Sequence, residues 1–521
     1  MKSLLIVLLA TLAAAAQKTD PLLPSQVVVV YNSLVPSSKD LAEFYALHRR
    51  IPTTNVIGLE VTEKSTIDRA TYEKFIRKPL VDEFDQRKFW IMGKDANGVE
   101  LPVKTRVRCL VLMKGLPLRI SRSKTPEPVG EEEGKKPRQF SQNNEASVDS
   151  ELSLMGVRGY PIGGSIPNPY FKKEIVASLN PYPYVLLVGR LDAHNYDHCK
   201  RMVLDALDVE KAGLWGRAYL DHSLKPGAFA VGDQWISKVA KLTAAKAHPT
   251  IVDRMSNTFV TNYPMSDAAV YFGWYTTHRN GPFLNPKMRF KKGAIAVHIH
   301  SFSAEQLINP DKNWCAALIE HGAAATLGNT WEPFLQLSHQ LDVFYDRLTK
   351  GYSLVEAAYL SINVLSWQNV VLGDPLYTPY LTTAVTAEAL KEDREYKLIR
   401  YAESRFPEPA ERTTQLLKAA DQSKNGSVYE MFAFAALEAG DTDTAREQFK
   451  RAKELFDNPA DQLRQVLNLV EVERRNNDPA AALTLLRQAK SNFADLPESK
   501  AIDGLLVILD PPPPPATQRK Q

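Results

Sequence analysis

Apolar β-branched runs alternate with amphipathic segments over most of this chain, and this alternation restricts its fold more than any other feature. Residues 27–31 (VVVVY) are typical of a strand buried on both faces, and a helix is expected at about 38–50. Further strands are expected at 56–61, 107–114, 184–191, 218–221, 268–275, 294–302 and 323–328. Strands alternating with helices predict βαβ units, and therefore an α/β domain with a mainly parallel sheet over residues 17–382.

A charged segment interrupts this alternation at residues 121–146. It holds three consecutive glutamates at 131–133 beside two lysines, and it contains few apolar residues. We expect a loop insertion there. Such a loop can be a lid over a site or a plain solvated insertion.

Strand patterns stop after about residue 380, and helical patterns run from 386 to 509. The small and large residues Ala445, Phe449 and Ala452 recur as Ala482, Leu486 and Ala489, an offset of 37 residues. This spacing predicts tetratricopeptide-like repeats, whose usual period is about 34 residues. About two repeats are fewer than usually fold alone, and we therefore expect them to pack on the α/β domain or on a partner. The Pro-rich residues 510–521 are expected to form a disordered tail.

The first sixteen residues have the pattern of a cleavable secretion signal. One lysine precedes a short apolar run, and Ala14 and Ala16 stand in the arrangement that signal peptidase recognises. The run is shorter than the roughly 20 residues of a membrane-spanning helix, and no later segment qualifies. We therefore expect an exported protein, periplasmic or extracellular, without a membrane span.

Charge and cysteine content exclude some functional classes. The 64 lysines and arginines nearly balance 60 acids, for a formal charge of +4, and they are scattered along the chain. Nucleic acid is therefore not an expected partner. The three cysteines, Cys109, Cys199 and Cys315, lie in apolar segments, which favours buried thiols over a disulfide framework.

Two kinds of chemistry are compatible with residues near the predicted strand ends. His298 and His300 have the period of one strand face, and Asp192, His194 and His198 follow another strand, so a divalent metal site is one hypothesis. Local hydrogen bonding is the alternative. No cofactor is otherwise implied.

The second hypothesis is acyl transfer. Ser301 and Ser303 follow one predicted strand, and His278 follows its neighbour. A serine nucleophile needs such a nearby base. The alternative is that these polar residues only cap loops.

Several short segments, in the same order along the chain, resemble gingipain-type cysteine peptidases. They are 184–191 (YVLLVGRL), 313–316 (NWCA), 322–330 (GAAATLGNT), 351–354 (GYSL) and 372–376 (LGDPL). Residues 113–120, 147–151 and 189–192 also resemble an uncharacterised family of exported bacterial proteins. The first resemblance covers about 27–380 and implies a caspase-like α/β fold with a histidine and a cysteine at successive strand ends.

This chain departs from the peptidase pattern at both catalytic positions. Trp274 stands where that family has histidine, and an indole cannot act as a base. The following strand end offers Ser301 and Ser303 but no cysteine, and Cys315 does not match. The family's dyad therefore cannot be transferred to any residue here.

Charged residues near the predicted strand ends are the remaining candidates for a binding site. Asp149, Glu151, Arg190 and Asp192 are these residues, with Trp274 beside them as a binding candidate. An internal ion-pair network is an equally good interpretation of the charges. The sequence thus favours a non-catalytic envelope protein that binds protein or peptide, with the helical repeats as the partner surface. An active hydrolase is the alternative.

Overall fold

The computed structural model describes residues 22–123, 143–159, 164–174, 180–255, 258–381, 385 and 388–511. The expected leader at 1–16 lies outside these residues. So do residues 124–142 of the expected insertion, residues 386–387 at the start of the expected helical region and residues 512–521 of the expected tail.

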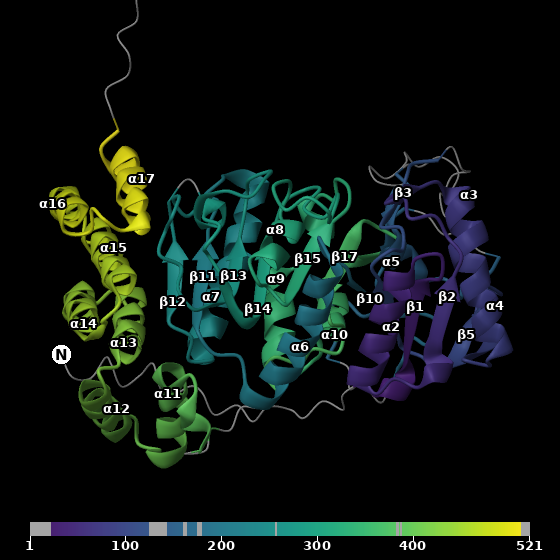
Figure 1. The fold of residues 1–521 in the computed structure, drawn as a ribbon, viewed down its shortest axis with the longest axis horizontal. Coiled ribbons are helices and arrows are strands. Elements are labelled where there is room, and N and C mark those ends of the chain that lie inside the picture. The colour runs from purple at the N-terminus through teal and green to yellow at the C-terminus, as the bar shows by residue number, and fades with distance from the viewer. Residues whose placement is uncertain are drawn as a thin grey trace, which may run out of the picture.

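A ten-stranded sheet forms the centre of the α/β domain (Figure 1), in the order β12-β11-β13-β14-β15-β17-β10-β6-β1-β2. The pairing is mostly parallel, while β15 and β17 are antiparallel. The strands are β1 (Val27–Asn32), β2 (Val56–Leu59), β6 (Cys109–Met113), β10 (Leu187–Leu191), β11 (Arg217–Asp221), β12 (Thr250–Asp253), β13 (Ala268–Gly273), β14 (Phe290–His298), β15 (Ala325–Asn329) and β17 (Asn369–Gly373).

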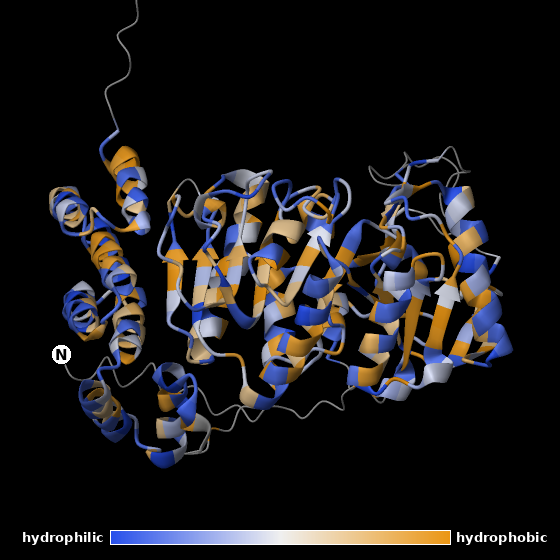
Figure 2. Cartoon of the chain, in the orientation of Figure 1, coloured by the Kyte–Doolittle hydropathy of each residue, from blue (hydrophilic) through white to orange (hydrophobic). Residues whose placement is uncertain are grey.

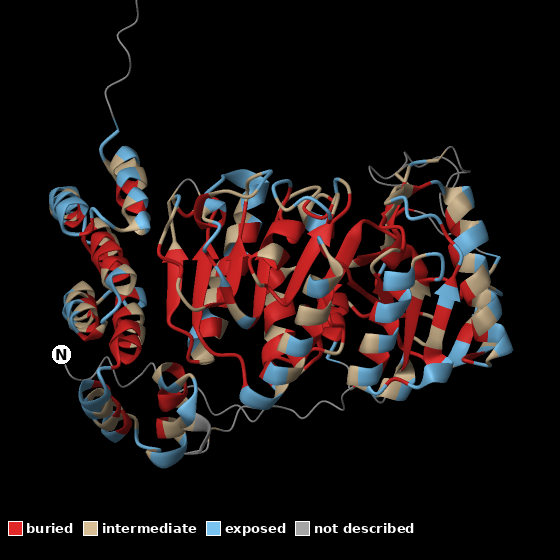
Figure 3. Ribbon diagram, in the orientation of Figure 1, coloured by how far each residue is buried: buried red, intermediate tan, exposed pale blue. Residues whose placement is uncertain are grey.

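Helices cover both faces of the sheet, which explains why its strands are apolar runs rather than alternating patterns. The two flanking groups, α2–α6–α8 and α7–α9–α10, lie on opposite faces. Figures 2 and 3 show the result, a hydrophobic and buried row of strands between amphipathic helices. The helices of this domain are α2 (Pro36–Arg49), α3 (Arg69–Tyr72), α4 (Lys78–Gln86), α5 (Val148–Leu152), α6 (Tyr196–Ala212), α7 (Ala230–Ala245), α8 (Cys315–Glu320), α9 (Leu341–Thr349) and α10 (Leu354–Ser361).

Three small sheets lie outside the central ten-stranded sheet. They consist of β3 (Thr66–Ile67), β7 (Arg119–Ile120) and β8 (Ala146–Ser147); β4 (Trp90–Lys94) and β5 (Glu100–Thr105); and β9 (Ile166–Pro167) with β16 (Val364–Leu365).

A run of helices follows the α/β domain, as the sequence predicts. Side chains cap several of them: Asn425, Asp441, Asn458 and Asp478 each accept a hydrogen bond from a first-turn backbone N–H. The helices are α11 (Arg394–Arg405), α12 (Pro409–Ser423), α13 (Gly426–Glu438), α14 (Thr442–Leu455), α15 (Pro459–Arg475), α16 (Pro479–Asn492) and α17 (Lys500–Leu509). The predicted fold class, α/β followed by all-α, is confirmed.

The recurring positions of the helical region have equivalent environments. Ala445, Phe449 and Ala452 are buried in α14, and Ala482, Leu486 and Ala489 are buried in α16. The small residues allow close approach of α15, which contacts both helices. No helix in the described part of the chain is long and apolar enough to cross a membrane.

A buried network of charges joins the helical region to the sheet. Glu430 of α13 accepts from Nε of Arg217 in β11 at 2.7 Å and from Nε of Arg464 in α15 at 2.8 Å. All three side chains are at most 2% exposed. Tyr396 and Ser427 also accept hydrogen bonds from Arg217. The helices are therefore fixed against the β11–β12 side of the sheet (Figure 1).

Candidate functional site

The loops that follow the strands of both halves of the sheet meet at one edge. Arg119, which follows β6, lies 3.5 Å from Glu305 beyond β14 and 3.4 Å from the carbonyl oxygen of Thr330 beyond β15. His194, beyond β10, contacts the carbonyl oxygen of Ile308. Sites in open α/β sheets form at such an edge, and the sequence-predicted residues lie along it.

His298 and His300 have separate environments. The strand β14 ends at His298, so His300 lies in the following turn and the expected strand over 294–302 is too long. His298 bonds Tyr271 through Nδ1 at 2.9 Å and stacks on Trp314 at 3.6 Å. Burial holds its pKa well below the ordinary value, and His300 lowers it further.

The serine and histidine residues considered for acyl transfer are not paired. Nδ1 of His278 accepts from the backbone N–H of Asn313 at 3.1 Å, and Oγ of Ser303 accepts from the N–H of Asn329 at 3.1 Å. Within the described residues, the hydroxyl groups of Ser301 and Ser303 have no hydrogen bond to a histidine ring, although the backbone carbonyl oxygen of Ser301 contacts Nδ1 of His300. A catalytic role for Ser301, Ser303 and His278 stays a prediction.

The metal hypothesis also stays without structural support. The described ranges contain no group of three or more His, Cys, Asp or Glu residues that could hold a metal ion. Asp192 is bonded to Lys114 and Arg190 instead, and His198 faces Glu320. Each expected ligand therefore has a local partner of its own.

Arg190 is the centre of an internal ion-pair network. Its side chain is fully buried, bonds Asp149 of α5 at 2.7 Å, and donates to the carbonyl oxygens of Leu116 and Pro117. Burial disfavours the charged form, but the carboxylates of Asp149 and Asp192 raise the pKa of Arg190 above its ordinary value. This geometry favours a role in fixing loops.

The other two binding candidates are also held inside the protein. Glu151 pairs with Arg69 at 2.8 Å and accepts from Ser366 at 2.9 Å. Burial raises the pKa of Glu151. Trp274 is buried and donates from its indole N–H to Asp233 at 2.6 Å.

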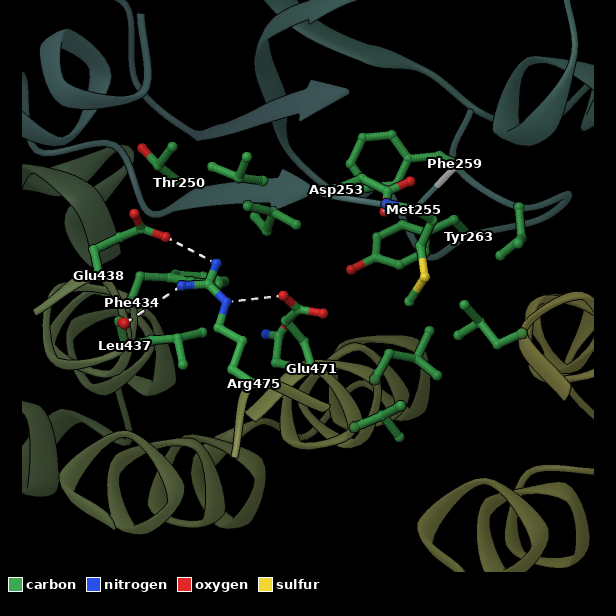
Figure 4. Close-up of a pocket in the computed structure, with 17 residues that line it drawn as sticks. Thr250, Asp253, Met255, Phe259, Tyr263, Phe434, Leu437, Glu438, Glu471 and Arg475 are labelled. Carbon is green, nitrogen blue, oxygen red and sulfur yellow. Dashed lines mark hydrogen bonds and ion pairs between the residues drawn. The ribbon is translucent and has the colours of Figure 1, made fainter. Parts of the chain in front are cut away.

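A pocket between the two domains is the feature that the sequence did not indicate. It lies between β12 and helices α13, α15 and α17 (Figure 4). Its apolar lining includes Ile251, Val252, Met255, Phe259, Val260, Phe434, Leu437, Leu467, Val470 and Leu505. We call it the interdomain pocket. It was missed because β12 is a short edge strand, and no strand was expected at 250–253.

Charged side chains surround the apolar lining. Arg475 bonds both Glu438 at 2.9 Å and Glu471 at 2.8 Å (Figure 4), and Arg254 also bonds Glu438. These pairs neutralise one another. A ligand would therefore meet an apolar interior within a neutralised polar rim.

The unpaired edge of β12 forms one wall of this pocket. The backbone of Asp253 accepts from His222 and that of Pro249 accepts from Ala218, so alternate residues bond to β11. The amide groups of Thr250 and Val252 therefore face the helices. Within the described residues, neither residue has a backbone hydrogen bond to the helical region.

Asp253, in the same wall, should make stability depend on pH. Burial raises its pKa to about 7, above the ordinary value of about 4 in an unfolded chain. The folded protein then keeps a proton that the unfolded chain releases, so this contribution to stability is fully present below about pH 4 and is lost as pH rises through about 7. We expect Asp253→Asn to remove that loss, so the variant gains stability relative to the wild type between about pH 5 and about pH 8.

Urea unfolding at several pH values measures this difference. Asp443→Asn is the matched control, because that side chain is 85% exposed. Parallel pH profiles for the wild type and Asp253→Asn would contradict the prediction.

A comparison with protein-family models, curated proteins and solved structures finds no match to this chain.

Proposed function

We propose that this protein is an exported binding protein that holds an extended peptide segment of a partner in the interdomain pocket. The observation that carries the proposal is the unpaired edge of β12, which faces an apolar pocket. A buried backbone N–H or C=O without a partner costs about 1–3 kcal/mol, so a peptide strand that pairs with Val252 would recover that free energy.

The lining supports a peptide as the ligand. The apolar side chains of β12, α13, α15 and α17 that line the pocket can contact apolar side chains of a peptide. Pairing with the backbone of Val252 supplies affinity, while the apolar lining selects the side chains that enter. Helices α13, α15 and α17 supply the opposite wall, in keeping with the use of helical repeats as partner surfaces.

The proposal also accounts for the sequence resemblance. We infer that the α/β domain derives from a gingipain-like peptidase fold that lost its dyad and kept a binding role. Support comes from the order of the resembling segments, the tryptophan at position 274 and the separate hydrogen-bond partners of His278 and Ser303. The leader-like residues 1–16 support export to the periplasm or beyond.

Peptide selection followed by affinity measurement tests the function. Random peptides displayed on phage are selected on the purified protein, and the dissociation constants of enriched peptides are measured by fluorescence anisotropy. We expect Met255→Trp, which fills the pocket, to weaken binding by about tenfold or more, a loss of about 1.4 kcal/mol. Val252→Pro should have a similar effect, because it removes the outward N–H but keeps the bonds from Ile251 and Asp253 to β11.

Met92→Trp is the matched control, because Met92 is a partly buried methionine on β4, away from the pocket. Thermal unfolding of all three variants shows whether each one is folded. Two results would overturn the proposal: no peptide is enriched, or enriched peptides bind the two pocket variants as tightly as the wild type.

A further inference from the structure

Asp253 is a charged residue of the interdomain pocket that has no ion-pair partner among the described residues. The other charged residues of the described lining are paired, since Arg475 bonds Glu438 at 2.9 Å and Glu471 at 2.8 Å. Figure 4 shows Asp253 apart from Arg475 and Glu438. The wall formed by β12 therefore presents a carboxylate to the pocket without a cation beside it.

The two oxygen atoms of the Asp253 carboxylate differ in their contacts. Oδ1 accepts a hydrogen bond from the backbone N–H of Met255 at 3.0 Å. No group in the described part of the chain donates a hydrogen bond to Oδ2. Because a carboxylate removed from water needs donors or a positive charge, Oδ2 is an open position for a cation.

The arginines near Asp253 are bound to glutamates instead. Arg254 bonds both oxygens of Glu438, at 3.2 and 3.3 Å, and Arg474 bonds both oxygens of Glu471, at 2.7 and 2.9 Å. Burial and the charge of Glu471 raise the pKa of Asp253, while the two arginines lower it only through space. Neither arginine is a direct partner of this carboxylate.

A second carboxyl group adds to the need for a cation. Asp221 of β11 is the register partner of Asp253, so the two side chains project from the same face of adjacent parallel strands. Asp221 is fully buried, and its Oδ1 has no hydrogen-bond partner among the described residues. Burial and the charge of Asp253 both raise the pKa of Asp221. A cation beside Asp253 would reduce this repulsion.

The side chain of a lysine combines the two properties that this wall requires. Its aliphatic stem can lie along the apolar lining while its ammonium group reaches a polar atom. An ammonium group is a compact charge that one oxygen can accept, whereas the fork of arginine suits both oxygens of a carboxylate. Since the N–H of Met255 already bonds Oδ1 of Asp253, the single open oxygen favours lysine.

We propose that the interdomain pocket selects peptides that carry a lysine, whose ammonium group pairs with Asp253 while its aliphatic stem contacts the apolar lining. This inference rests on the peptide-binding function proposed above and names the class of peptide. Strand pairing at Val252 is available to any peptide, so Asp253 is the residue that gives the selectivity.

Norleucine in place of lysine tests the proposal on the wild-type protein. Peptides enriched by phage display are synthesised with acetylated N-termini, so that lysine side chains carry their only ammonium groups. Dissociation constants are measured by fluorescence anisotropy at pH 8, above the pKa of about 7 of Asp253. Norleucine keeps the aliphatic stem and lacks the charge, so we expect it to weaken binding by about tenfold or more.

Asp253→Asn should bind the lysine and norleucine peptides with similar affinity. The amide keeps an oxygen for the N–H of Met255 but does not neutralise an ammonium group. This variant is expected to fold, because it gains stability as described above. Asp443→Asn is the matched control, at a side chain that is 85% exposed, and it should keep the wild-type preference for lysine.

The outcomes separate this inference from the function on which it rests. If no peptide is enriched, both are overturned. The lysine preference alone is overturned if the enriched peptides lack lysine, if wild-type protein binds the lysine and norleucine peptides equally, or if Asp253→Asn keeps the preference.

Discussion

Replacing Glu430 with alanine is expected to lower the free energy of unfolding by about 3–5 kcal/mol, among the largest effects of any single change in this chain. Glu430 is fully buried between Arg217 and Arg464 and also accepts from Gln465 at 2.7 Å. Its removal leaves two guanidinium groups in the interior without their shared carboxylate. The lost contact lies between the domains, so the helical region should loosen first.

Urea unfolding followed by tryptophan fluorescence measures the change in stability, and hydrogen exchange of α13 and α15 locates it. Glu454→Ala is the control in the same region, because that glutamate is 64% exposed and its ion pair with Arg451 is screened by solvent. Equal losses of stability in Glu430→Ala and Glu454→Ala would contradict the view that the buried charge network fixes the helices to the sheet.

Arg190→Met is expected to lower the free energy of unfolding by a similar amount, about 3–5 kcal/mol, because it leaves the buried carboxylate of Asp149 without its guanidinium partner. The same change removes the donors to the carbonyl oxygens of Leu116 and Pro117, so the loop after β6 should lose its protection from hydrogen exchange. Asp192 keeps a partner in Lys114 and contributes less to the loss. Arg451→Met, at a 43% exposed arginine whose ion pairs are screened by solvent, is the control and should change stability far less than Arg190→Met.

A double variant separates an ion-pair role from a binding role. Arg190→Met with Asp149→Leu removes both buried charges, so part of the lost stability should return. If Arg190 instead served to bind a ligand, the single variant would unfold like the wild type. That outcome would contradict the structural role proposed for the network.

At the candidate site, the residue pattern predicted which residues lie near the strand ends but not which groups they contact. Spacing placed His298 and His300 on one strand face, but the strand ends at His298 and the two rings have different partners. The sequence pattern was also compatible with two roles for Arg190, as a binding residue or as part of an internal ion-pair network. Only the positions of Asp149 and of the Leu116 and Pro117 carbonyl groups, from distant parts of the chain, favour the second interpretation. Asp253 was not considered, because the lack of an ion-pair partner has no sequence signature.

The sequence by itself determined the alternation of strands and helices, the change to a helical region after about residue 380 and the recurring small and large positions in α14 and α16. These follow from local burial, because a strand covered on both faces must be apolar throughout and a packed helix must be apolar on one side. Tertiary structure alone decided the docking of the helices through Glu430, the interdomain pocket at β12 and the position of Asp253 without an ion-pair partner among the described residues. The first two depend on groups from distant parts of the chain or on a backbone edge left unpaired, and the third depends on nearby arginines that bond glutamates instead; no local pattern records these relations.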